Sequence, residues 1–249
     1  MTPRMLPILA AALLALPVIG RPARASEATA AGAPVLVELF TSQGCSSCPP
    51  ADAFLKELSG RDDVIALSFH VDYWDRLGWR DPYASGWNTR RQRDYRDAFA
   101  LPYVYTPQMV VDGRDQAVGS DRSAVTALID RHRRDGGAVP FTLEARGDGS
   151  ARLVIPARPG LSGRLTLFGY DREHRIDIRA GENSGRRLLN TNVVAVVEDW
   201  GLWSGEAVDI SHPLPEPREG RGYALVLSEE AGGPFRTGVL GAARLGAAP

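Results

Sequence analysis

Runs of apolar residues divide the first part of the chain into strands and a helix. Residues 34–40 and 64–71 are largely apolar runs of strand length, which predicts two buried strands. Between them, Phe54, Leu55 and Leu58 have the spacing of one helix face. A helix between two buried strands predicts a β-α-β unit with a parallel pair of strands.

The next segment continues this pattern after an interruption. Residues 72–105 are polar and rich in aromatic side chains, and we expect an insertion that is helical in part. Residues 108–112 and 115–118 flank a glycine-containing turn and predict a hairpin. Residues 120–134 predict a helix that ends before Gly136. The order β-α-β, insertion, β-β-α is that of a thioredoxin-like domain.

The pattern changes after this point to short strand-like runs separated by turns rich in Gly, Pro and Asp. The runs are residues 141–145, 151–155, 163–170, 192–197, 207–210 and 223–227. Their spacing predicts an antiparallel sandwich or a small barrel. The predicted fold is therefore α/β, with a thioredoxin-like domain over residues 34–137 that carries the insertion. An all-β, sandwich-like domain over residues 138–249 follows it.

The first 25 residues are typical of a secretory signal peptide. Arg4 precedes an apolar run over residues 5–19, and Ala23-Arg24-Ala25 forms a small-residue cleavage pattern. The alternative is an uncleaved membrane anchor, but the run is shorter than a membrane span. We expect cleavage after Ala25 and a short leader over residues 26–33. The mature protein is then exported, periplasmic or secreted, with no stable membrane insertion.

Composition and cysteine usage narrow the function. The net charge of -1 gives no electrostatic reason to expect nucleic acid as a partner. A chain of 249 residues builds a core without disulfide staples, yet it has two cysteines, Cys45 and Cys48. A bridge between them closes so short a loop that it stabilises the fold little. Redox chemistry or metal binding explains the pair better than a structural role.

The position of the pair favours thiol chemistry. Cys45 and Cys48 follow a predicted strand and begin a predicted helix, whose N-terminal dipole favours a thiolate. Cys45 is the predicted attacking sulfur and Cys48 the resolving one. The expected partners are thiols and disulfides of proteins or small molecules, with no cofactor beyond the Cys45–Cys48 disulfide itself.

Thr106 and Pro107 directly precede the predicted strand over residues 108–112. A thioredoxin-like site has a cis proline at this point, opposite the cysteines, and we expect a cis Thr106–Pro107 bond. The backbone of Thr106 is then a candidate for binding an extended substrate peptide. The alternative is an ordinary trans proline at the start of a strand.

Two ionisable residues are weaker candidates. Glu38, on the first strand, is a candidate proton shuttle for Cys48, or else a carboxylate bonded to nearby backbone or facing out along an edge. His70 ends the second parallel strand, at the edge of the sheet where the site is expected. It either stabilises the Cys45 thiolate or is a structural histidine. A metal site for copper or zinc would use Cys45, Cys48 and His70.

Two further segments surround the expected site. The insertion is rich in Trp and Tyr, which either line a substrate groove or pack the insertion onto the sheet. The loop of residues 181–185 is bounded by glycines. It either folds back on the thiol pair or forms a plain turn, and we prefer the plain turn.

Four stretches of the chain carry a family resemblance. They are ELFTSQGCSSCPPAD at residues 38–52, FHVDYWD at 69–75, YTPQM at 105–109 and GENSG at 181–185. In these stretches the chain resembles a family of secreted proteins known as domain of unknown function 1223 (DUF1223). The resemblance implies a thioredoxin-like fold but no established activity.

The predicted function is that of an exported thiol–disulfide oxidoreductase. Two alternatives stay open. One is a copper or zinc carrier, and the other is a thioredoxin-like binding module that does not use its cysteines catalytically. The sequence does not distinguish an oxidant from a reductant or an isomerase, because the Ser-Ser dipeptide between the cysteines leaves the reduction potential open.

Overall fold

A computed structural model describes residues 33–135, 139–229 and 238–245 of the chain. The predicted signal peptide and most of the predicted leader lie outside the described residues. So do Gly136 and Gly137, where the predicted domain boundary falls. The described residues belong to one compact unit.

The predicted β-α-β unit is present. It consists of β1 (Val35–Thr41), α1 (Pro49–Leu58) and β2 (Val64–His70). The two strands are parallel, with Val35 opposite Val64 and Thr41 opposite His70. Every residue of both strands is buried, which agrees with their largely apolar sequences.

The insertion and the predicted hairpin follow in order. The insertion contains a short 3-10 helix, η1 (Asp75–Leu77), and α2 (Gly86–Ala98), which the Ser85 side chain caps. The hairpin consists of β3 (Gln108–Val111) and β4 (Asp115–Val118), and α3 (Arg122–Asp135) follows it. Strand β3 pairs antiparallel with β1, so β1 lies between β2 and β3.

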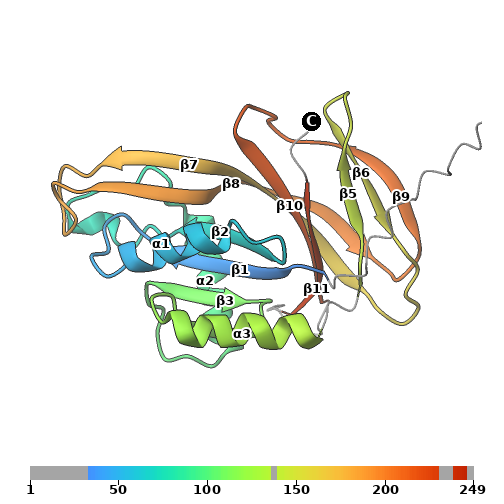
Figure 1. The fold of residues 1–249 in the computed structure, drawn as a ribbon, viewed down its shortest axis with the longest axis horizontal. Coiled ribbons are helices and arrows are strands. Elements are labelled where there is room, and N and C mark those ends of the chain that lie inside the picture. The colour runs from blue at the N-terminus through green and yellow to red at the C-terminus, as the bar shows by residue number, and fades with distance from the viewer. Residues whose placement is uncertain (1–32, 136–138, 230–237, 246–249) are drawn as a thin grey trace, which may run out of the picture. The chain divides into compact units, whose positions relative to one another are not determined.

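Seven strands follow α3 among the described residues. They are β5 (Thr142–Ala145), β6 (Ser150–Ile155), β7 (Gly163–Asp177), β8 (Arg187–Trp203), β9 (Val208–Pro213), β10 (Arg221–Glu229) and β11 (Val239–Leu245). One sheet has the strand order β11-β10-β7-β8-β2-β1-β3-β4, and a smaller sheet has the order β5-β6-β9 (Figure 1). The protein is thus a mixed α/β fold with one large mixed sheet.

The expected free-standing sandwich in the C-terminal half is not confirmed. Strands β7, β8, β10 and β11 instead extend the sheet of the N-terminal half, and β8 joins the edge of β2 where Val193 lies opposite Ser68. The Ser68 hydroxyl donates to the Thr191 carbonyl at 3.0 Å, and the Asn192 amide donates to the Ala66 carbonyl at 2.8 Å. The physical reason is that β2, buried on both faces, would otherwise leave unpaired backbone groups along its edge.

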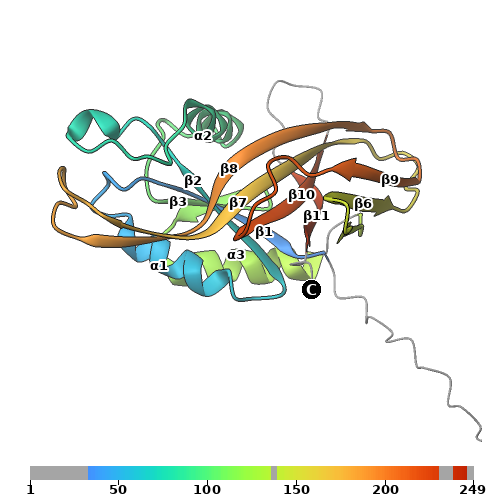
Figure 2. The same cartoon turned by 90° about the horizontal axis from the view of Figure 1, so that it is seen from above.

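Helices cover both faces of the N-terminal strands. Successive side chains of β1 alternate between these faces. Val37 and Leu39 pack with residues of α1 and α3, whereas Leu36 and Phe40 pack with Tyr95 of α2. Figure 2 shows α2 on one side of the sheet and α1 with α3 on the other. In the part of the chain that the structure describes, no helix has the length and apolar character needed to cross a membrane.

Candidate thiol–disulfide site

The two cysteines are joined in a disulfide at the start of α1. Their Cα atoms lie 5.4 Å apart, and Cys48 is the N-cap residue of the helix. The Cys45 amide donates to the Ser42 carbonyl at 3.1 Å, so a tight turn leads from β1 into the pair. Both cysteines are fully buried, whereas Ser46 and Ser47 between them are exposed. A partner molecule therefore meets the two serines before it meets either sulfur.

The loop of residues 181–185, here called the covering loop, bonds to the backbone of the turn that holds Cys45. The buried Asn183 amide donates to the carbonyls of Gln43 and Cys45, both at 2.9 Å. The Glu182 carboxylate accepts from the Ser46 amide at 3.1 Å. The preferred interpretation of this loop as a plain turn is therefore wrong, because the loop at the end of the β7–β8 hairpin folds back on the thiol pair.

Glu182 also occupies the positive end of α1. The Ser46 amide lies just before the helix, where the positive end of the helix dipole favours a negative charge. The hydrogen bonds from Ser46 lower the pKa of Glu182 below its ordinary value. The carboxylate thus takes a place at the helix N-terminus that a Cys45 thiolate also favours.

A buried carboxyl group lies one helical turn beyond Cys48. Asp52 follows Cys48 by four residues on α1, so their side chains share one helix face. The Asp52 amide donates to the Cys48 carbonyl at 3.1 Å, and the Thr41 hydroxyl donates to the Asp52 carboxyl at 2.9 Å. Burial raises the pKa of Asp52 to about 6, against the opposing effect of His70. Sequence reasoning missed Asp52, although an acid on the apolar face of the helix was visible.

His70 belongs to the same buried cluster. Its Nδ1 lies 2.6 Å from Oδ2 of Asp81, and both side chains are fully buried. Burial opposes protonation of the imidazole, but the Asp81 carboxylate outweighs it and raises the pKa of His70, with a further contribution from Asp52. Its Nε2 has no hydrogen-bond partner among the described residues. His70 therefore lies close enough to Asp52, the buried carboxyl one turn beyond Cys48, for the two charges to interact.

The segment before Cys45 is anchored to this cluster. The Gln43 amide donates to the Asp81 carboxylate at 2.8 Å, and the Gln43 side chain bonds Asn190 of β8 and the Trp79 indole. Burial raises the pKa of Asp81, but the nearby His70 and the hydrogen bonds that the carboxylate accepts bring it below its ordinary value. A charged Asp81 thus holds both His70 and the turn that presents Cys45.

Glu38 lies on the opposite side of the sheet from α1. The alternation along β1 places its side chain with Leu36 and Phe40, where Arg91 donates to it at 2.6 Å and the Tyr95 hydroxyl also donates to it. The structure therefore does not bring the candidate proton shuttle Glu38 to the cysteines. Asp52, on the α1 side, is the buried carboxyl beside Cys48.

Thr106 and Pro107 have the cis bond that the sequence predicts. The peptide bond between them is cis, and Pro107 directly precedes β3. A Cβ atom added at Gly119 would meet Ala51 of α1 at 3.1 Å and Pro107 at 3.2 Å, so Pro107 lies close to the beginning of α1. The Thr106 hydroxyl accepts from the Trp74 indole at 2.8 Å.

The aromatic residues of the insertion mostly pack. Trp74 lies against Gly44, where an added Cβ atom would be 3.1 Å from the Trp74 Cβ, and Trp79 is bonded to the segment before Cys45. Tyr83 and Trp87 line a cavity of about 490 Å³ against β8. These rings thus pack the insertion onto the sheet, and two of them line a cavity.

The residues of the metal alternative have other partners in this structure. Cys45 and Cys48 are bonded to each other, and the Nδ1 of His70 faces Asp81. Over residues 33–135, 139–229 and 238–245, no group of three or more His, Cys, Asp or Glu side chains has an arrangement that fits a metal ion.

Comparisons with other proteins give a family and one solved relative. The family model described as protein of unknown function (DUF1223) matches residues 36–228. The X-ray structure of a structural-genomics target from Agrobacterium tumefaciens is 33% identical in sequence, with a TM-score of 0.76. The match covers 85% of this chain and 93% of that one. A search of curated proteins found no match.

Proposed function

The chain belongs to the DUF1223 family, whose description states no activity, and we propose from its own site that it is a thiol–disulfide oxidoreductase. The observation that carries the proposal is the Cys45–Cys48 disulfide at the start of α1, with the buried carboxyl of Asp52 one turn beyond Cys48. Helix N-termini favour thiolates, and a buried carboxyl next to a thiol is placed to exchange a proton with it.

The arrangement of the N-terminal half supports a thioredoxin-like assignment. Strands β1 and β2 are parallel, β3 runs antiparallel to β1, and the local strand order is β2-β1-β3-β4. Helix α1 connects β1 to β2 and begins at the cysteines, and Pro107 precedes β3 near the same helix end. We propose that α2 and its flanking loops are an insertion into this thioredoxin-like core, and that the C-terminal strands extend it.

The chemistry is two successive thiol–disulfide exchanges. From the dithiol form, the Cys45 thiolate attacks a substrate disulfide, forms a mixed disulfide and releases one substrate thiolate. The Cys48 thiolate then attacks the Cys45 sulfur, which restores the Cys45–Cys48 disulfide and releases the second substrate thiolate. The substrate gains two electrons and two protons, and the two cysteines lose them. The reverse sequence oxidises a substrate dithiol.

The surrounding residues have distinct roles in this mechanism. Asp52 accepts the proton of Cys48 before the second step, because a pKa of about 6 leaves this carboxyl mostly ionised at neutral pH. His70 and Asp81 are positioning residues that hold a charge near Asp52 and anchor the turn before Cys45. The backbone at Thr106 offers the site for an extended partner.

Two conditions follow for the site in the cell. The covering loop bonds to the backbone of Gln43, Cys45 and Ser46, and we infer that it opens before a partner reaches the buried sulfurs. The N-terminal signal pattern also implies an oxidising compartment outside the cytoplasm, where such a disulfide persists. Export would be tested by locating the mature protein in cell fractions and sequencing its N-terminus, which we expect to be Ser26.

The test of the activity is the reversible redox cycling of the cysteine pair. The mature protein is equilibrated in glutathione buffers, and the reduced fraction is measured by alkylation and mass spectrometry. We expect a single two-electron transition between about -270 and -120 mV, the range of thioredoxin-type proteins. Cys48→Ser should accumulate a mixed disulfide through Cys45, whereas Cys45→Ser should not. Ser123→Ala, an exposed change on α3, should leave the cycling intact. A pair that does not cycle reversibly would overturn the proposal.

A further inference from the structure

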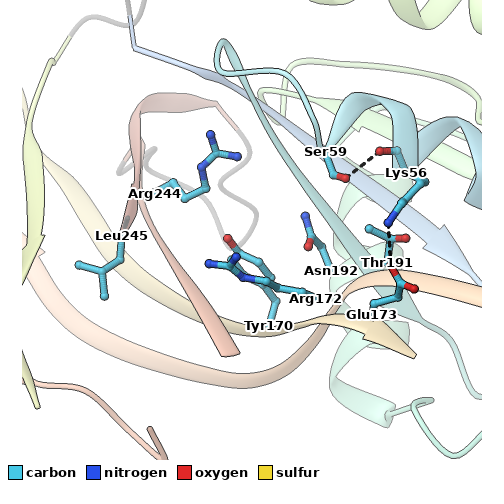
Figure 3. A pocket seen from close by; sticks show the side chains of 9 residues that line it. All are labelled: Lys56, Ser59, Tyr170, Arg172, Glu173, Thr191, Asn192, Arg244 and Leu245. Atoms are coloured by element: carbon cyan, nitrogen blue, oxygen red, sulfur yellow. Dashed lines mark hydrogen bonds and ion pairs between the residues drawn. The ribbon is translucent and has the colours of Figure 1, made fainter. Parts of the chain in front are cut away.

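A cavity of about 370 Å³ lies near the C-terminal end of α1, between that helix and strands β7, β8 and β11 (Figure 3). Its wall includes Lys56 of α1, Arg172 of β7 and Arg244 of β11. Lys56 follows Cys48 by eight residues, which is about 12 Å along a helix axis. The cavity is therefore separate from the disulfide site.

The cavity has an excess of positive charge. Lys56 is neutralised by Glu173, whose carboxylate lies 2.7 Å from the Lys56 ammonium group. Neither Arg172 nor Arg244 makes a side-chain hydrogen bond to any residue in the described ranges. The nearest carboxylate to Arg244 is that of the fully exposed Asp62, at 3.8 Å. Two guanidinium groups thus remain to interact with whatever occupies the cavity.

Tyr170 brings a hydroxyl group to the same place. The register between β7 and β8 shifts at Gly169 and Tyr170, and such an irregularity re-aims a side chain. The Tyr170 ring lies across Gly222, where an added Cβ atom would be 2.5 Å from its Cζ. Burial raises the pKa of Tyr170, whereas Arg244 and Arg172 both lower it, so both cations lie close enough to act on its hydroxyl.

The wall on the β8 side is polar as well. Thr191 and Asn192 line it, and the buried Thr191 hydroxyl has no hydrogen-bond partner in the described part of the chain. Buried polar groups normally have a partner. Arg172, Arg244 and Tyr170 line the cavity, and Figure 3 shows these three side chains.

We propose that this cavity is a binding site for an oxyanion, a phosphate or carboxylate group held by Arg172, Arg244 and Tyr170. Guanidinium groups match the oxygens of phosphates and carboxylates in pairs of parallel hydrogen bonds, and a hydroxyl adds a further donor. The cavity volume lies in the range of small-molecule sites, so the anionic group can belong to a small organic molecule. This inference does not depend on the proposed redox function.

The test is calorimetric titration of the mature protein with inorganic phosphate and, separately, with succinate, at constant ionic strength set with chloride. We expect saturable binding of at least one of them, and the stronger ligand identifies the preferred anion. Arg172→Gln and Arg244→Gln should each weaken that binding about tenfold or more. Arg164→Gln removes the same charge from the same strand outside the cavity, next to Asp199, and should leave the affinity unchanged.

A third variant keeps the test informative if an arginine change unfolds the protein. Tyr170→Phe retains the ring on Gly222 and removes the hydroxyl alone, and should weaken binding several-fold. Saturable binding with these losses and an unaffected Arg164→Gln supports the site. An absence of saturable binding with both anions would overturn the inference. So would equal affinity in the wild type and in the Arg172→Gln/Arg244→Gln double variant.

Discussion

Asn183 is the residue that ties the covering loop to the disulfide site. Its amide donates two hydrogen bonds of 2.9 Å, to the carbonyls of Gln43 and Cys45, and its own oxygen accepts from Arg186 at 3.2 Å. The side chain is fully buried. Replacing Asn183 with Ala removes both bonds to the site and leaves two carbonyl groups without this partner, while the rest of the loop sequence stays the same.

The magnitude follows from these two bonds. A buried hydrogen bond contributes about 0.5–1.5 kcal/mol net, so the loss of two destabilises the closed loop by about 1–3 kcal/mol. This raises the population of the open loop by a factor of about 5 to 150. A reductant that attacks the sulfurs only when the loop is open should react faster by the same factor, provided that opening and closing are faster than the attack.

The assay is the rate of reduction of the Cys45–Cys48 disulfide by a phosphine in native buffer, followed by alkylation and mass spectrometry. Gln92→Ala is the matched control, because Gln92 is also a fully buried carboxamide that donates two hydrogen bonds, to Tyr105 and Gln108. It lies on α2, away from the covering loop. Equal reduction rates in Asn183→Ala and the wild type, or equal acceleration in Gln92→Ala, would refute the idea that the loop controls access.

Two further predictions concern buried carboxyl groups. Burial raises the pKa of Asp52 from 3.8 to about 6 in the folded protein. Between these two pH values the folded protein binds more protons than the unfolded chain, so its stability falls as the pH rises from about 4 to about 6. Asp52→Asn removes the titrating group, so the stability of this variant relative to the wild type should rise by up to about 3 kcal/mol between about pH 4 and pH 7.5. Urea unfolding at both pH values measures this difference, and a difference that does not change with pH would contradict the effect of burial. Arg91→Met leaves the fully buried Glu38 carboxylate without its cation and should cost about 3–5 kcal/mol, of which Glu38→Gln in the same chain should recover a part. Equal stability of the single and double variants would show that the pair does not interact energetically.

Local patterns predicted the elements of the N-terminal half well. The apolar runs and the helix spacing gave β1, α1 and β2 because burial on both faces leaves a continuous apolar sequence. The partners of the later strands were not predictable in this way. Strand β8 reaches β2 through bonds such as that of Ser68 to Thr191, which lie 123 residues apart, and no local pattern encodes such a pairing. The separate sandwich was predicted because strand signals do not say which sheet a strand joins.

At the candidate site, too, the features set by local sequence were predictable and the contacts between distant segments were not. Cys45 and Cys48 stand out by spacing and position, and the cis bond at Pro107 follows from topology. The proton-shuttle alternative for Glu38 does not fit the structure, because the alternation along the strand puts Glu38 with Leu36 rather than with the residues that face α1. Asp52 could have been found as an acid on the apolar face of α1.

The contacts of the covering loop depend on the two halves of the chain sharing one sheet. The turn that holds Cys45 follows β1, and Glu182 and Asn183, which bond to the backbone of that turn, come from the loop that ends the β7–β8 hairpin. Such contacts at 2.9–3.1 Å require the hairpin to be held in register with β1. The pairing of β8 with β2 provides that register, because β2 is also the direct neighbour of β1. The covering loop and the disulfide are therefore positioned by the same set of paired strands. A change where β2 pairs with β8 should alter the exposure of the sulfurs before it alters the fold of α1.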